Sequence, residues 1–273
     1  MRIGVPKEIK TLEFRVGATP GIIQRLVHEG HQAFVETGAG AGIGISDQTY
    51  RDVGAQILPD ADAVFDASDM IVKVKEPQAE EIARLKPRHI LFTYLHLAAD
   101  PHQARGLMES GCTAIAYETI TDRFGRLPLL APMSQVAGRM AVDVGAYHLL
   151  KPHGGRGLLL GGAPGVLPAK VLILGGGVAG KHAAQMAVGQ RADVTLFDIS
   201  AARLEELDDQ FGGSVKTCFS THDLVRDHLP TADLIIGCVL IPGAAAPKLV
   251  TRAGSTPGAP PNSRPRPPAG LSR

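Results

Sequence analysis

The stretch Val171-Leu-Ile-Leu-Gly175-Gly-Gly177-Val-Ala-Gly180 combines an apolar strand, a tight glycine turn and the start of a helix. Gly175 permits a sharp turn, Gly177 lets the backbone approach a pyrophosphate, and Gly180 allows the helix to pack closely on the strand. The free N–H groups and partial positive charge at the helix N-terminus favour phosphates. This order of elements predicts a dinucleotide-binding domain.

A second apolar run, residues 193–197, is followed directly by Asp198, an acidic residue at the position where such domains distinguish NAD from NADP. Asp198 lies eighteen residues after Gly180, where it can accept hydrogen bonds from both hydroxyls of an adenosine ribose. Its carboxylate would repel a 2′-phosphate, so the sequence predicts NAD in preference to NADP. The alternative is a glycine-rich turn in an α/β protein that binds no nucleotide.

The composition and the cysteine spacing are typical of an ordinary cytoplasmic protein. The chain has 273 residues, 44% apolar residues and a net charge of +1, which favours neither a nucleic acid nor a membrane as partner. Cys112, Cys218 and Cys238 are far apart and are expected to be reduced thiols. The first ten residues are too charged for a signal peptide, and no segment is apolar and long enough to span a membrane.

Short apolar runs alternate with helical patterns in residues 1–130, which is typical of a parallel sheet with helices on both faces. Pro20 follows Thr19, a good N-cap, and is expected to begin the first helix. The expected strands are residues 3–5, 33–35, 70–74, 90–94 and 113–116, and the expected helices are residues 20–28, 47–53, 79–85 and 101–110. The fold class is therefore α/β, with a doubly wound first domain.

The second predicted domain, residues 131–252, begins with a long helix at about residues 132–150 that crosses between the domains. Residues 151–168 contain six glycines and no helical period, so they are expected to form a loop. The expected strands are residues 171–174, 194–197, 214–219 and 233–238. A doubly wound Rossmann sheet normally has six strands, so this domain is expected to be incomplete. Residues 253–273 are rich in Pro, Gly and Arg, without an acid, and are expected to be disordered.

Several stretches resemble alanine dehydrogenases, among them Val72-Lys-Val-Lys-Glu-Pro77 and Thr93-Tyr-Leu-His-Leu-Ala98. The others are residues 4–10, 13–20, 35–44, 132–138, 161–168 and 240–250. The chain is identified as a member of the family of alanine dehydrogenases and pyridine nucleotide transhydrogenases. This resemblance implies the oxidation of L-alanine with NAD⁺ and water to pyruvate, ammonium and NADH. It also implies a substrate domain over residues 1–130 and assembly as a homohexamer.

The resemblance places Arg15 and Lys75 where the family holds the substrate carboxylate. A guanidinium can bind a carboxylate bidentately, and an ammonium adds a point charge. His96 matches the family's acid/base histidine, which moves protons in the carbinolamine and imine steps. Each residue has an alternative interpretation. Arg15 could be a surface arginine, and Lys75 could be a solvated lysine at a strand end, like the neighbouring Lys73. His96 could be a packed histidine, which is the role expected of His89.

The resemblance also implies a set of NAD contacts that extends beyond the glycine turn. Arg203 stands where relatives often carry lysine, and it could equally be a solvated helix residue. Ser134 and Ser220 could instead cap helices. The implied NAD contacts are Ser134, Gly175, Gly177, Val178, Ala179, Gly180, Asp198, Arg203, Ser220, Val239 and Leu240.

The chain departs from the family pattern after about Arg252, as if truncated or frame-shifted. The family supplies a later aspartate that helps to activate water and hold the substrate ammonium group, and the colinear position here is Gly270. We therefore expect very low turnover. An inactive NAD-binding remnant or partner subunit is the alternative. A transhydrogenase component is less expected, because it would not need the acid/base histidine His96.

Overall fold

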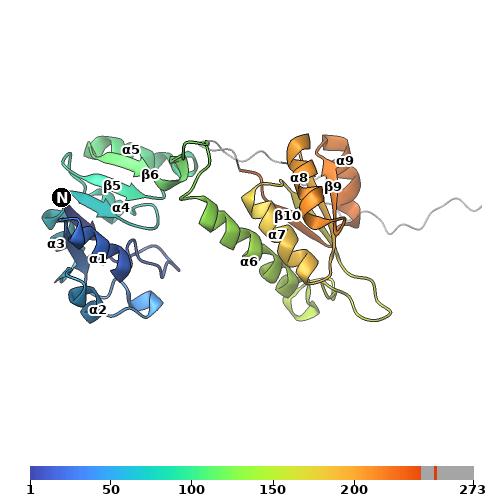
Figure 1. Ribbon diagram of the computed structural model, residues 1–273, viewed down its shortest axis with the longest axis horizontal. Coiled ribbons are helices and arrows are strands. Elements are labelled where there is room, and N and C mark those ends of the chain that lie inside the picture. The colour runs from blue at the N-terminus through green and yellow to red at the C-terminus, as the bar shows by residue number, and fades with distance from the viewer. Residues whose placement is uncertain (241–248, 251–273) are drawn as a thin grey trace, which may run out of the picture. The chain divides into compact units, whose positions relative to one another are not determined.

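A computed structural model of the protein describes residues 1–240 and 249–250. The described chain divides into two compact units, Met1–Leu130 and Ala131–Leu240, and each is built on a parallel sheet (Figure 1). The predicted α/β class is therefore confirmed. The predicted disorder of residues 253–273 concerns a segment that lies outside the described residues.

The first sheet has the strand order β3-β2-β1-β4-β5-β6, and all its strands are parallel. Its strands are β1 (Arg2–Val5), β2 (Gln32–Glu36), β3 (Gln56–Leu58), β4 (Met70–Val72), β5 (Ile90–Thr93) and β6 (Thr113–Ala116). The chain winds outward from β1 to β3 and then returns to place β4 on the other side of β1. Ligands of doubly wound folds bind at such a switch point, beyond the carboxyl ends of the strands.

The helices of this unit cover both faces of the sheet. They are α1 (Pro20–His28), α2 (Asp47–Asp52), α3 (Ala61–Ala67), α4 (Ala79–Ile82) and α5 (Pro101–Ser110), with 3-10 turns η1 (Ala41–Ile43), η2 (Leu97–Ala99) and η3 (Tyr117–Thr119). Ile71 of β4 lies in one core with Phe65 and Leu107, whereas the next residue, Val72, packs on another core that contains Ile23. This alternation along one strand is what a sheet buried on both faces requires.

The second sheet has the order β10-β7-β8-β9, again entirely parallel. Its strands are β7 (Lys170–Leu174), β8 (Asp193–Asp198), β9 (Val215–Phe219) and β10 (Leu234–Gly237), which are the four predicted. The helices are α6 (Ala131–Leu149), α7 (Val178–Gly189), α8 (Ala201–Phe211) and α9 (His222–His228), with 3-10 turns η4 (Lys151–His153) and η5 (Leu229–Thr231). The switch point lies between β7 and β10.

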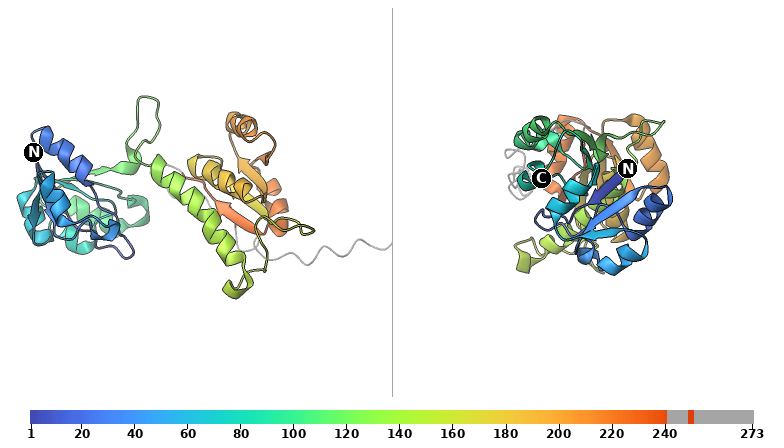
Figure 2. Two further views of the ribbon diagram at one scale, coloured as in Figure 1. Left: turned by 60° about the horizontal axis from the view of Figure 1, so that its bottom comes forward. Right: turned by 90° about the vertical axis from the view of Figure 1, so that its left-hand side faces the viewer.

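Helix α6 lies alongside α7, and Figure 2 shows the same neighbours from another side. The approach is close at Gly138, where an added Cβ would lie 2.1 Å from the carbonyl oxygen of Ala179. Only a glycine fits at this crossing, which fixes α6 against the start of α7.

Some elements differ from the prediction. β3 and α3 were not predicted from the sequence, and α4 ends at Ile82 instead of near residue 85. Pro20 begins α1 as predicted, although the side chain of Thr19 makes no capping hydrogen bond. Among the described residues no helix is long and apolar enough to cross a membrane, and no cluster of acidic, histidine or cysteine side chains could hold a metal ion.

Candidate functional site

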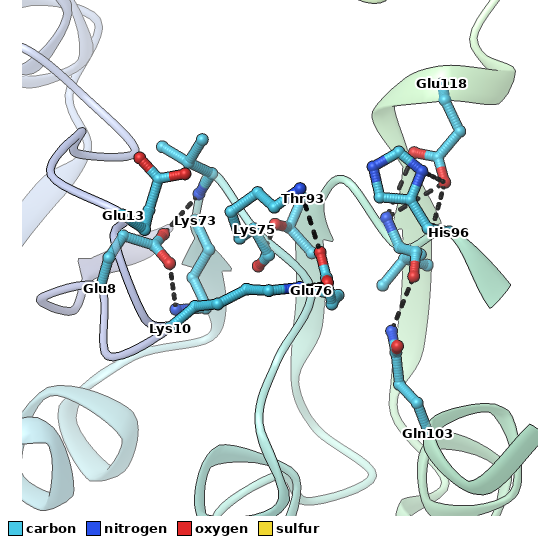
Figure 3. A network of polar contacts seen from close by, with 12 residues as sticks. Glu8, Lys10, Glu13, Lys73, Lys75, Glu76, Thr93, His96, Gln103 and Glu118 are labelled. Carbon is cyan, nitrogen blue, oxygen red and sulfur yellow. Dashed lines mark hydrogen bonds and ion pairs between the residues drawn. The ribbon is translucent and has the colours of Figure 1, made fainter. Parts of the chain in front are cut away.

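The candidate site of the first unit lies at the carboxyl edge of its sheet, where the ends of four neighbouring strands meet. Arg15 follows β1, Lys75 follows β4, His96 follows β5 and Glu118 follows β6. Because the strands are parallel, the loops after them leave the sheet at the same edge. Figure 3 shows the polar contacts of this region.

Arg15 is oriented by Glu13. Its Nη2 and Nε atoms donate to the two carboxylate oxygens at 2.6 and 2.8 Å, and its backbone N–H donates to the same carboxylate at 2.9 Å. These hydrogen bonds lower the pKa of Glu13 below its usual value and keep it ionised. The Arg15 side chain remains 44% exposed, so the guanidinium is both fixed and reachable by a ligand.

Lys75 shares its surroundings with two other cations. Its Nζ lies 3.5 Å from Oε2 of Glu76, which also forms an ion pair with Lys10. Burial lowers the pKa of Lys75, and the positive charges of Lys10 and Arg15 lower it further. We refer to Lys10, Arg15 and Lys75 as the cationic cluster. The three cations exceed the two carboxylates of Glu13 and Glu76 that they contact, and this excess of positive charge favours an anion such as a carboxylate.

His96 lies beside this cluster in a backbone conformation that is unusual for a histidine. Its φ angle is +49°, in the left-handed region, and its ring stacks on Tyr94 with a centroid distance of 5.9 Å. Burial lowers the pKa of the imidazole; Glu118 raises it, and Lys75 and Lys10 lower it. The net lowering favours the neutral ring, which is the form that accepts a proton. By contrast, His89 is 1% exposed and is held by backbone groups, as expected of a packed histidine.

Two features of this site escaped the sequence analysis. Glu118 was not singled out, although it directly follows the predicted strand at 113–116. Lys73 was taken as an example of a solvated lysine, and this was wrong. Its side chain is 0% exposed and is paired with Glu8 and Glu81 at 3.1 and 2.5 Å. A charged residue type indicates solvent contact only when no buried partner is available.

The glycine turn of the second unit has the geometry that dinucleotide binding requires. Gly175 has a φ of +103°, and an added Cβ at Gly177, the N-cap of α7, would meet no atom within 4 Å. A Cβ at Gly180 would lie 1.8 Å from the carbonyl oxygen of Gly175. The turn is therefore tight at Gly175 and Gly180 but open at Gly177, where a pyrophosphate would reach the N–H groups of the helix.

Asp198 and Arg203 both hold the turn at Gly176. The Asp198 carboxylate accepts from the Gly176 N–H at 2.6 Å and from the Ser200 N–H at 2.8 Å. Nε of Arg203 donates to the Gly176 carbonyl at 2.7 Å, so Arg203 is more than a solvated helix residue. The acid thus stands against the turn, at the place where a ribose would follow a bound pyrophosphate.

The remaining predicted NAD contacts lie on several elements. Val178 and Ala179 begin α7, and Val239 and Leu240 follow β10. Val239 lies against the glycine turn, because its backbone nitrogen would be 3.1 Å from a Cβ added at Gly175. The two suggested caps are wrong. Ser134 is the fourth residue of α6, and Thr221 caps α9 in place of Ser220.

Comparison with known proteins decides the family. The family models named "Alanine dehydrogenase/PNT" match through the N-terminal domain over residues 4–137 and the C-terminal domain over residues 141–254. The alanine dehydrogenases of Halomonas elongata and Bacillus subtilis are 55% and 54% identical over 92% of this chain. A solved L-alanine dehydrogenase is 50% identical over 93% of the chain, with a TM-score of 0.84. The chain belongs to the alanine dehydrogenase family.

The chain spans about two thirds of the length of these alanine dehydrogenases. It covers 68% of the Halomonas protein, 66% of the Bacillus protein and 70% of the solved structure. A transhydrogenase from Sinorhizobium meliloti is also similar, at 29% identity and a TM-score of 0.75, over 93% of this chain and 74% of its own. As a member of the alanine dehydrogenase family, the chain is an oxidoreductase with NAD as its cofactor.

Gly180→Ala is expected to destabilise the second unit. The new methyl group would overlap the Gly175 carbonyl, and relief requires movement of backbone, at a cost of about 1–3 kcal/mol in the free energy of unfolding. Gly189→Ala is the matched control, because its Cβ on the same helix meets nothing within 4 Å. The control is expected to be neutral or to stabilise by up to about 1 kcal/mol. Denaturant unfolding of both variants checks this, and equal stability would contradict it.

Proposed function

We propose that this chain acts as an alanine dehydrogenase, which converts L-alanine, NAD⁺ and water to pyruvate, ammonium and NADH. The observation that supports this function is the position of His96 beside the cationic cluster, at the carboxyl edge of one sheet. The cluster suits a substrate carboxylate, and the histidine suits a proton transfer near the adjacent carbon. We further propose that residues 1–130 bind the substrate and that residues 131–252 hold NAD.

In this mechanism the residues of the first unit bind, orient and exchange protons. Arg15 binds the substrate carboxylate with its planar guanidinium, and Lys75 adds a positive charge to the same group. His96 takes a proton from the water that adds to the imine carbon, and it returns a proton to the nitrogen that leaves the carbinolamine. NAD, when bound, supplies the hydride acceptor for oxidation at Cα.

The set of proposed NAD contacts fits the cofactor. Gly177 leaves its backbone open, and the N-terminus of α7 provides N–H groups for the phosphates. Asp198 would bind the ribose hydroxyls, and Arg203 would hold the turn and approach the adenosine end. The other proposed contacts are Ser134, Gly175, Val178, Ala179, Gly180, Ser220, Val239 and Leu240.

Production of NADH from L-alanine and NAD⁺, followed at 340 nm with size-checked protein, tests the proposed function. A second candidate is a chain that binds NAD without turning over alanine. The sequence feature that supports this second candidate is Gly270, which the family resemblance puts, by colinear count, at the position of the family's aspartate and which lies outside the described residues. Saturable NAD binding without NADH production would support that second candidate.

We also propose that the chain works in alanine catabolism in the cytoplasm and assembles with copies of itself, as the hexamer that the family resemblance implies. One face of α6 supports self-association. It exposes Val136, Met140 and Val144 on successive turns, each about half exposed. Such a stripe of apolar side chains along a helix is typical of an interface. Sedimentation of the purified chain measures the oligomeric state.

Asp198→Asn is expected to weaken the preference for NAD over NADP. The amide keeps an acceptor for the Gly176 N–H but loses the charge that would repel a 2′-phosphate. We expect the ratio of the two dissociation constants to change by about tenfold or more, which corresponds to about 1.4 kcal/mol. Asp193→Asn at the other end of β8 is the control and should leave the ratio unchanged. An unchanged ratio in Asp198→Asn, measured by calorimetry, would refute this role.

A further inference from the structure

We propose that Glu118 is a positioning residue, which holds the backbone at His96 in its left-handed conformation and presents a carboxylate to the imidazole ring. The proposal deepens the proposed function, on which its kinetic readout rests. Glu118 lies in η3, directly after β6, whereas His96 follows β5, the adjacent strand. The contact therefore joins two neighbouring loops at the carboxyl edge of the sheet.

The Glu118 carboxylate accepts hydrogen bonds from two consecutive backbone N–H groups. Its Oε1 lies 2.6 Å from the His96 nitrogen, and its two oxygens lie 3.1 and 3.2 Å from the Leu95 nitrogen. Oε1 is also 4.0 Å from Nδ1 of the imidazole (Figure 3). One side chain therefore holds the backbone of the turn through hydrogen bonds and places its carboxylate within ion-pair distance of the imidazole ring.

The backbone at His96 needs such support. A non-glycine residue with a φ of +49° is disfavoured and persists only where its surroundings hold it. Gln103 assists from α5, since its Nε2 donates to the Leu95 carbonyl at 2.9 Å. The Leu95 peptide groups are thus bound on both sides, by Glu118 at the N–H and by Gln103 at the carbonyl.

The charge of Glu118 also opposes the other influences on the His96 ring. Burial and the positive charges of Lys75 and Lys10 lower the pKa of His96, and Glu118 is the group that raises it. The Glu118 side chain is only 16% exposed, so solvent screens its charge less than that of a surface residue. Without this carboxylate, the imidazole would be a weaker base at the pH where it must accept a proton.

Glu118→Gln tests the proposal, because it keeps the size of the side chain and an acceptor but removes the charge. The titration of His96 is read from the pH dependence of its modification by diethyl pyrocarbonate, which attacks the neutral imidazole. Mass spectrometry quantifies the peptide that contains residue 96, with the exposed His102 as internal reference. We expect the midpoint for His96 to move to lower pH in Glu118→Gln and to stay unchanged in the control Glu109→Gln, an exposed glutamate of α5.

The kinetic readout is a fall in kcat for L-alanine of about 10- to 100-fold with little change in KM, because the base is misplaced while the cationic cluster is intact. Glu118→Asp keeps the charge on a shorter side chain. This variant should restore the midpoint of His96 modification in part but should not restore kcat. It replaces Glu118→Gln as the test if the glutamine variant does not fold. An unchanged midpoint would overturn the proposal. A lowered midpoint in a chain that produces no NADH would support the positioning role and count against the proposed function alone.

Discussion

His96→Gln is expected to lower kcat for L-alanine oxidation by about 10²- to 10⁴-fold, the usual effect of removing a general acid–base group. KM for alanine should change little, because Arg15 and Lys75 remain. Dissociation constants for NAD should be unchanged, since the proposed NAD contacts lie in the other unit. Initial rates at 340 nm and calorimetry with NAD measure the two quantities.

The pH profile of the unmodified chain gives a second check on His96. Its pKa lies below the ordinary value for histidine, and the ring must be neutral to accept a proton. The rate of alanine oxidation should therefore stay constant through neutral pH and decline only as the pH falls through this lowered pKa. The decline should be absent from the residual rate of His96→Gln. His102→Gln, at the exposed start of α5, is the control and should keep full activity; equal losses in both variants would contradict the assignment.

Lys73→Met is expected to cost about 3–5 kcal/mol in the free energy of unfolding, the range observed when one partner of a buried ion pair is removed. Lys73 is the shared partner of Glu8 and Glu81, whose side chains are each 2% exposed. Without the ammonium, both buried carboxylates would lose their counter-ion and keep only their hydrogen bonds from the backbone N–H groups of Val74 and Gln78. Lys86→Met is the matched control, because this half-exposed lysine pairs with an exposed Asp66 and should cost no more than about 1 kcal/mol.

The loss in Lys73→Met should depend on pH in a defined direction. Burial raises the pKa of Glu81 above its ordinary value even with Lys73 present, so the folded state binds a proton more readily than the unfolded state. Stability linked to Glu81 is therefore complete below the ordinary value of 4.5 and is lost as the pH rises through the raised pKa. Removal of Lys73 should steepen this loss. Urea unfolding at several pH values checks it, and a pH-independent deficit would show that lost packing dominates.

Most of the fold could be predicted from the sequence because its signals are local. Apolar runs locate the strands of both sheets, and the roles of Gly175 and Gly180 follow from backbone geometry within a few residues. The missed strand β3 has only three residues, with no fully buried side chain to give a hydrophobic signal. The equally short runs at residues 3–5 and 33–35 could be predicted because their side chains are apolar and buried.

The candidate site was predictable only in part, because some of its contacts join residues that are far apart in the sequence. Lys73 and Glu8 are 65 positions apart, and their pairing depends on β1 and β4 being neighbours in the sheet. Glu118 and His96 are likewise joined through the adjacent strands β5 and β6. A single sequence identifies the residue types at strand ends, but the strand order decides which of them meet.

The hydrogen bonds at Gly176 have a consequence for the thermodynamics of nucleotide binding. Asp198 holds the N–H of Gly176 and Arg203 holds its carbonyl, so the peptide groups on both sides of this residue are restrained without a ligand. Glycine otherwise loses more conformational freedom than any other residue when it becomes ordered. Since this conformational entropy is already lost on folding, it does not add to the free-energy cost of nucleotide binding. The turn is thus preorganised for its ligand. Amide exchange in the turn should consequently be slow before a nucleotide arrives and should slow only slightly afterwards.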